Sequence, residues 1–240
     1  MNILIIFRGG YDRVKMPHSI SNNIIKYIIE PLHSQGYNVE TKFCTYDYDL
    51  NKLQVFKDKL HPSKIHFVRN GQHDNFKDAL HITRDIYDKY DYIIFLRFEI
   101  IYKINIIDWN IFNKEGMIFP YKEDCDTWYK RSILYGDCIL IFSKKYYIDI
   151  INILLLTDNS NFMALHNIEH IVHTKIPTIP MHCILSGQYN SNTGLPKNDP
   201  ALSPLYIGTC WKYNNTDLDL YLITDPLDKE FTLSLTHGTI

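Results

Sequence analysis

Short apolar runs alternate with longer amphipathic stretches over the first hundred residues, and this alternation limits the fold more than any other feature of the sequence. Four runs have the length and composition of buried strands: 2–7 (NILIIF), 37–46, 64–70 and 91–98 (DYIIFLRF). Three stretches between them place apolar side chains at helical spacing: 20–33, 50–60 and 74–90. Strand, helix and strand in this order are typical of a parallel sheet with right-handed crossovers.

The remaining sequence is less regular and extends the same α/β plan. Strand-like pieces occur at 106–112, 116–120, 136–142 and 178–185, and helical patterns at 144–157 and 162–175. Within the first helix, Ser19 or Ser21 is a candidate N-cap and Gly36 is expected to end it; Asp74 is a candidate N-cap of the third. We expect one domain, 1–240, with a mostly parallel sheet between helices.

Composition excludes several classes of protein. The 240 residues are 45% hydrophobic, which is ample for a core, and the formal net charge of -2 provides no field that would gather nucleic acid. The five cysteines show no C-x-x-C spacing, which indicates reduced thiols in a cytoplasm-like compartment. No apolar run approaches the ~20 residues of a membrane-spanning helix.

Charged residues, two glycines and an asparagine lie where the expected strands end. They are Arg8, Gly9, Gly10, Asp12 and Arg13 after the first strand, Arg69 and Asn70 after the third, and Arg97 and Glu99 after the fourth. Ligands of open parallel sheets bind at this edge, and guanidinium groups match phosphate, so the pattern indicates an anionic, phosphate-bearing ligand. FRGGYDR has no complete nucleotide-loop fingerprint, so a tight turn with exposed arginines, and a solvated Arg97–Glu99 pair, remain alternatives.

One stretch resembles a known enzyme family. Asp91-Tyr92-Ile93-Ile94, then Arg97-Phe98-Glu99, then Lys103 are similar to GT-A type nucleotide-sugar glycosyltransferases, in particular to viral and bacterial members with R-F-D in place of D-x-D. The preceding helix 78–90 and GDCILIFSKKY (136–146) share the resemblance, which covers about residues 2–175. It implies a GT-A-like (Rossmann-like) sheet, a nucleotide-binding half at 1–103, and an acceptor-binding half with a C-terminal covering segment at 104–240.

The resemblance also implies an activity and a set of site residues. The activity is transfer of a hexose from a nucleoside-diphosphate sugar, with a UDP-sugar favoured, to a glycan or other hydroxyl acceptor, in a host cytoplasm or on a virion. The nucleotide contacts would be Arg8, Gly9, Gly10, Arg13, Arg84 and Arg97. Glu99, with His182 as a weaker candidate, would hold manganese or magnesium, although Arg97 in place of the first acid of D-x-D weakens a metal site.

In inverting members of this family a carboxylate that opens a strand after a flexible loop deprotonates the acceptor, and Asp137 is the matching candidate; a plain aspartate in a turn is the alternative. Asp124 and Asp126 are rivals for this role, and Trp128 or Tyr129 could stack on an acceptor sugar.

Two other functions remain open. His166, His170 and His173 share one helix face beside Glu169, as a metal-dependent hydrolase would need, but the order is not H-E-x-x-H, and a solvated face or an acceptor contact explains them as well. A non-catalytic carbohydrate- or protein-binding module would keep the same sheet.

Overall fold

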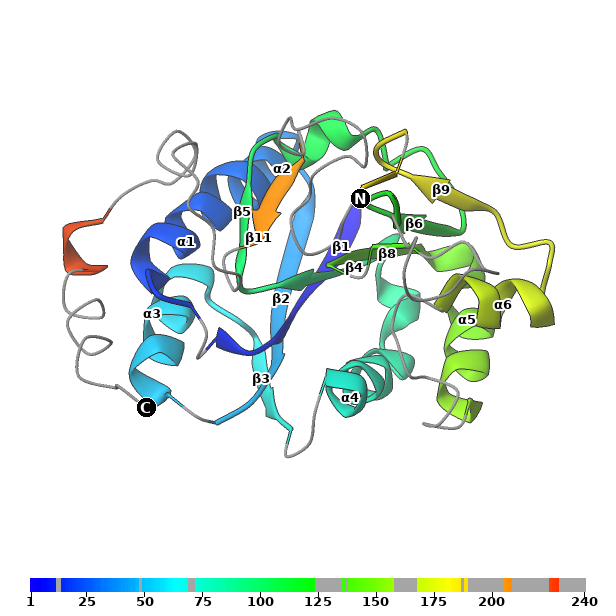
Figure 1. Ribbon diagram of the computed structural model, residues 1–240, viewed down its shortest axis with the longest axis horizontal. Coiled ribbons are helices and arrows are strands. Elements are labelled where there is room, and N and C mark those ends of the chain that lie inside the picture. The colour runs from blue at the N-terminus through cyan, green and yellow to red at the C-terminus, as the bar shows by residue number, and fades with distance from the viewer. Residues whose placement is uncertain are drawn as a thin grey trace.

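A seven-stranded sheet forms the centre of the molecule, in the order β3-β2-β1-β4-β8-β6-β9 (Figure 1). The computed structural model describes residues 1–11, 14–47, 49–68, 72–123, 135–136, 138–157, 168–186, 188–189, 205–208 and 225–228. The strands are β1 (Asn2–Gly9), β2 (Asn38–Thr45), β3 (Lys64–Phe67), β4 (Tyr92–Arg97), β6 (Met117–Phe119), β8 (Ile139–Ser143) and β9 (Met181–Cys183). All of these strands except β8 run parallel to one another, which confirms the expected mostly parallel α/β sheet.

Two short pairs stand apart from this sheet. β5 (Ile100–Tyr102) pairs antiparallel with β11 (Tyr206–Gly208), and β7 (Lys122–Glu123) pairs parallel with β10 (Gln188–Tyr189). The first pair joins the turn after β4 to a segment about a hundred residues later in the chain.

Helices cover both faces of the sheet (Figure 1). One face carries α1 (Pro17–Ile24), the π-helical η2 (Ile25–Ile29), α2 (Glu30–Ser34) and α3 (Leu50–Leu60); the other carries α4 (Gln72–Arg84), α5 (Lys144–Leu156) and α6 (Ile168–Lys175). Side chains of β1 alternate between the two cores: Phe7 packs on the α1 side and Ile6 on the α4 side. A strand buried on both faces needs a continuous apolar run, as residues 2–7 provide.

Helix ends depart from the predictions. The first helix begins at Pro17 with Met16 as N-cap, so Ser19 and Ser21 lie inside it and the predicted serine caps are wrong. Likewise α4 begins at Gln72, which places Asp74 within the first turn and not at the cap. The end at Gly36 is confirmed by its positive φ of 74°.

The prediction of a strand at 106–112 is also wrong. These residues form a 3-10 helix, η4 (Ile106–Trp109), which ends at Asn110 in the left-handed conformation with φ 52°. Ile106 and Trp109 are both buried, so one helical turn buries the same apolar side chains that a strand would have buried. A short apolar run cannot distinguish these cases.

Across the residues that the structure places, no helix has both the length and the hydropathy that a membrane crossing needs.

Candidate functional site

Arg8 and Arg97 lie side by side at the carboxyl edge of the sheet. They are register partners on the adjacent parallel strands β1 and β4. Phe7 and Leu96, which precede them, pack into the core on the α1 side, so the two arginines face the α4 side. Arg8 is fully buried, and its guanidinium carbon lies 5.4 Å from the ring centre of Phe76 in α4.

Glu99 joins Arg97 in a buried ion pair. It lies in the turn after β4, where the Nε of Arg97 donates to its Oε1 at 2.7 Å and Nη2 donates to the same oxygen. The side chain of Glu99 is only 2% exposed and that of Arg97 15%. The predicted alternative of a solvated pair is therefore wrong, because both side chains are largely removed from solvent.

Gly9 brings the end of β1 against this pair. Its φ is 95°, and a Cβ at this position would stand 3.7 Å from Oε2 of Glu99. The hydroxyl of Thr45 on β2 donates to the carbonyl oxygen of Gly9 at 2.6 Å. Gly10 follows, also buried. The structure thus gathers Arg8, Gly9, Gly10, Arg97 and Glu99 at one edge.

Phe98 fixes the two charged residues that flank it. Its ring centre lies 5.0 Å from that of Phe43, 5.1 Å from Phe56, 5.7 Å from Phe7 and 6.2 Å from Tyr11. These rings form the core on the α1 side. Side chains alternate along a strand, so Arg97, the last residue of β4, faces away from that core, and Glu99 follows Phe98 in the turn. The sequence signal for this anchor is the single aromatic between two charges.

Asn75 is a further residue of this edge that sequence reasoning missed. It is fully buried at the start of α4, and its Nδ2 donates to the carbonyl oxygen of Cys44 at 2.8 Å. Cys44 is the register partner of Arg8 on β2. Burial raises the pKa of the Cys44 thiol to about 12, which makes it a poor nucleophile at neutral pH.

Two predicted residues lie away from this group. Arg84 is exposed at the end of α4, and the chain after it reaches Asp91, whose amide donates to the carbonyl oxygen of Asn2 at 2.8 Å. Arg84 therefore belongs to the opposite edge of the sheet. His182 lies on β9, three strands from β4 and hence roughly 14 Å away, and its Nε2 is 3.0 Å from the carbonyl oxygen of Glu115. Glu99 and His182 cannot share a metal ion.

Other predicted residues fall outside the described ranges: Arg13, Arg69, Asn70, Asp124, Asp126, Trp128, Tyr129, Asp137 and His166, with the side chains of Glu169 and His170. His173 is exposed on α6. Within the described ranges no three His, Cys, Asp or Glu side chains are close enough to hold a metal ion. Glu99 is a single carboxylate already bound by Arg97, so these residues alone do not fit a divalent metal.

Comparisons with known proteins place the fold. No protein-family model matches the sequence, and no curated protein is similar to it. Among solved structures, 4-diphosphocytidyl-2C-methyl-D-erythritol synthase from Anaerococcus prevotii matches with a TM-score of 0.53 and 10% identity over 99% of both chains.

Two other structures match less closely. A protein assigned as a nucleotide-diphospho-sugar transferase, from Desulfovibrio desulfuricans G20, gives a TM-score of 0.48 and 11% identity over 79% of this chain and 80% of its own. A glycosyltransferase involved in the glycosylation of the major capsid of PBCV-1 gives 0.43 and 11% identity over 80% and 84%. The match to the synthase, at 10% identity, establishes the fold alone.

Proposed function

We propose that this protein is a glycosyltransferase that moves a sugar, a hexose in the first instance, from a nucleoside-diphosphate sugar to a glycan or another hydroxyl acceptor. The observation that carries the proposal is the pairing of Arg8 and Arg97 on neighbouring strands at the carboxyl edge of a parallel sheet. Ligands of such sheets bind at this edge, and two guanidinium groups on one face match the charge of a diphosphate.

We assign each residue of the candidate site, and Asp137, a role in this reaction. Arg8 and Arg97 stabilise the negative charge that develops on the leaving diphosphate. Gly9 lets the backbone approach the phosphates, because it has no side chain to fill the space beside Glu99. Glu99 accepts a hydrogen bond from a hydroxyl of the donor sugar once Arg97 turns to the diphosphate. Asp137 is proposed as the base of an inverting reaction.

The bond changes follow from these roles. The acceptor oxygen forms a bond to the anomeric carbon as the bond from that carbon to the diphosphate oxygen breaks. The electron pair of the broken bond leaves with the diphosphate, and the acceptor proton passes to Asp137. No step is assigned to a metal ion, and manganese and magnesium are included in the test below.

A second candidate is nucleotidyl transfer, which joins a nucleotide to a phosphorylated acceptor. It is favoured by the match to the 4-diphosphocytidyl-2C-methyl-D-erythritol synthase over 99% of both chains. The same pair of arginines would then bind a nucleoside triphosphate in place of a diphosphate sugar, so the two reactions differ in the donor that stabilises the protein.

One thermal-shift panel tests both candidates. UDP, GDP, CDP, their sugars and the nucleoside triphosphates are added with and without manganese or magnesium. A ligand at about a hundred times its Kd stabilises a fold by about 2.7 kcal/mol, which raises the Tm of a chain of this size by about 5–10 °C. We expect this shift with a diphosphate sugar; a larger shift with a triphosphate favours the second candidate.

Two arginine variants provide the matched pair. Arg97→Ala should lose the nucleotide shift, whereas Arg84→Ala, which removes an exposed arginine from the other edge, should keep it. Stabilisation by zinc alone would support the histidine-based hydrolase. No shift with any nucleotide or metal would support a binding module and contradict the proposed transferase.

A further inference from the structure

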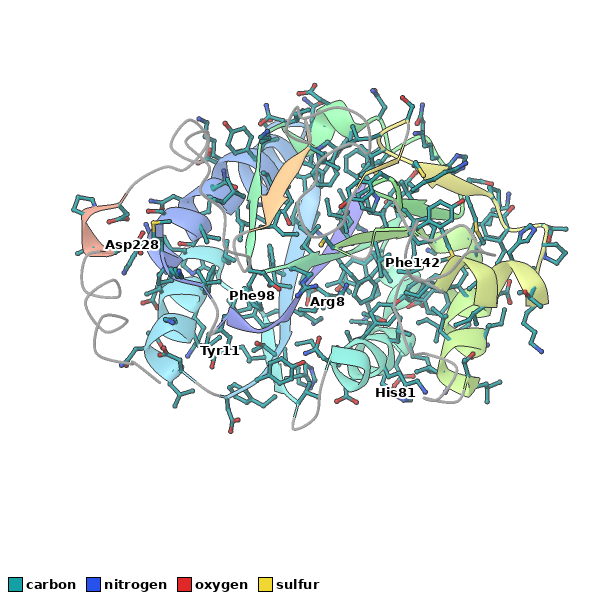
Figure 2. All side chains as sticks on the ribbon, in the orientation of Figure 1. Arg8, Tyr11, His81, Phe98, Phe142 and Asp228 are labelled. Atoms are coloured by element: carbon teal, nitrogen blue, oxygen red, sulfur yellow. The ribbon has the colours of Figure 1, made fainter. Side chains whose placement is uncertain are left out.

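Asp228 binds the first turn of α1 from the far end of the chain. It lies in η7 (Pro226–Asp228), beside α1 (Figures 1 and 2). Its Oδ1 accepts from the amide of His18 at 2.8 Å and its Oδ2 from the amide of Ser19 at 2.7 Å. The hydroxyl of Ser19 donates to Oδ2 as well. Asp228 is only 5% exposed, so this contact is enclosed.

This carboxylate replaces a local helix cap. The first amides of a helix have no partner within the helix, and a cap residue next to them normally accepts their hydrogen bonds. The N-cap of α1 is Met16, which makes no side-chain cap bond, and no acidic residue lies in the first turn. Asp228 satisfies two of these amides from 209 or more positions away and adds a negative charge where the helix dipole favours one.

Asp225 strengthens the same attachment. Its amide donates to the hydroxyl oxygen of Ser19 at 2.9 Å, and its Oδ2 accepts from the Nδ2 of Asn22 at 3.2 Å. Lys59 of α3 lies 3.7 Å from the same oxygen. Residues 225–228 therefore bind two helices of the α1 face by side-chain and backbone groups together.

Helix α1 follows one segment of the candidate site in the chain and contacts the strand after the other. It begins seven residues after Gly10, at the end of the loop that leaves β1. In its last turns Asn23 donates from Nδ2 to the carbonyl oxygen of Tyr102 at 2.9 Å and accepts from the Tyr102 amide at 2.7 Å. Tyr102 ends β5, which begins directly after Glu99. A displacement of α1 would thus act on the chain that follows Gly10 and on the strand that follows Glu99.

We propose that Asp228 is a positioning residue for the nucleotide site, which it sets through α1. The segment 225–228 is then a working part of the enzyme and not only a cover over the fold. This inference rests on the proposed function, because it is nucleotide binding that Asp228 is expected to support.

The test compares Asp228→Ala with Ile28→Val. Ile28 is fully buried on the same helical stretch, so its variant loosens the core without touching the cap. Amide hydrogen exchange should show His18 and Ser19 exchanging at least tenfold faster in Asp228→Ala and unchanged in Ile28→Val. UDP titration at a temperature where both are folded should show a Kd about tenfold higher in Asp228→Ala and within twofold of wild type in Ile28→Val.

A milder variant covers the case in which Asp228→Ala fails to fold. Asp228→Asn keeps an acceptor for His18 and loses the one for Ser19, so UDP affinity should fall between those of wild type and Asp228→Ala. Two results would overturn the positioning role and leave the proposed function standing. One is a variant whose His18 and Ser19 amides exchange faster while its UDP affinity equals that of wild type. The other is unchanged exchange of these two amides in Asp228→Ala. Failure of the wild-type protein to bind any nucleotide removes the proposed function first, and this inference with it.

Discussion

Arg97 and Glu99 form an ion pair across one turn, with 2.7 Å between Nε and Oε1, inside a site that we propose for an anion. A diphosphate must compete with Glu99 for the same guanidinium. The Glu99 carboxylate therefore holds Arg97 in place before the ligand arrives, which favours binding. It also repels the negative charge of the ligand, which opposes binding.

Replacement of Glu99 by glutamine separates these effects. Without a metal, Glu99→Gln should tighten UDP binding by about threefold to tenfold, because it removes a like charge near the diphosphate. If Glu99 instead binds manganese, the same variant should lose any manganese dependence of UDP affinity. Isothermal titration with and without manganese measures both, with Glu115→Gln, an exposed carboxylate paired with Lys145, as the control. Weaker metal-free binding in Glu99→Gln would contradict the competition.

Gly9→Ala should weaken nucleotide binding, whereas Gly36→Ala, with a similar loss of stability, should not. Gly9 and Gly36 both have positive φ, 95° and 74°, so an alanine strains the backbone at either, by about 1–2 kcal/mol. Only at Gly9 would the new methyl point at a neighbour, Oε2 of Glu99 at 3.7 Å; at Gly36 nothing lies within 4 Å. Urea unfolding should give similar losses of stability, while UDP affinity falls in Gly9→Ala alone. Equal affinities would show that the backbone at Gly9 does not approach the ligand.

The sequence was sufficient to predict the first four strands of the sheet, because their signals are local. The first four strands and their helices follow from apolar runs and helical spacing, and parallel pairing follows from their order. The direction of β8 could not be predicted, because an apolar run is the same for a parallel and an antiparallel strand. The 3-10 helix at 106–109 could not be predicted, because a short apolar run fits a strand and a helical turn equally well.

Some residues of the candidate site could be predicted from the sequence, and others could not. Arg8, Arg97 and Glu99 could be placed together because each follows a strand of one parallel sheet. Asp228 could not, because a cap supplied from more than two hundred positions away leaves no spacing in the sequence. Arg84 was misplaced for a related reason: a helix that returns antiparallel to the strands carries its last residue to the other edge.

Phe98→Ala should be strongly destabilising. Phe98 is fully buried with four aromatic neighbours, so its truncation should cost about 3–5 kcal/mol. Phe67→Ala is the matched control, because Phe67 is 52% exposed on the edge strand β3 and should change stability by no more than about 0.5 kcal/mol. Chemical unfolding of both variants measures the difference. A loss below about 1 kcal/mol in Phe98→Ala would show that the Phe98 ring does not anchor the turn after β4.

Asp137→Asn should abolish sugar transfer and leave UDP affinity within about twofold of wild type. A positioned base contributes about a hundredfold to ten-thousandfold to the rate, whereas the amide keeps the shape of the carboxylate. Asp124→Asn and Asp126→Asn test the rival carboxylates in the same assay of radiolabelled sugar transfer. Full activity in Asp137→Asn would exclude Asp137 as the base, and loss of activity in one rival alone would transfer the role to it.

Glu40 should make stability depend on pH in acid solution. Burial pushes its pKa up, but hydrogen bonds from Lys42, Ser63 and Tyr90 outweigh this effect and hold the pKa at about 2. A carboxyl whose pKa is lower in the folded than in the unfolded chain stabilises the fold above its unfolded value, about 4.3, and loses that contribution as pH falls toward the folded value. Wild type should therefore be more stable than Glu40→Gln at pH 7, with the difference shrinking between about pH 4.5 and pH 2. Thermal unfolding of both proteins across this range measures it, with Glu115→Gln as a surface control; a difference that persists unchanged at pH 2 would show that the charge of Glu40 is not its source.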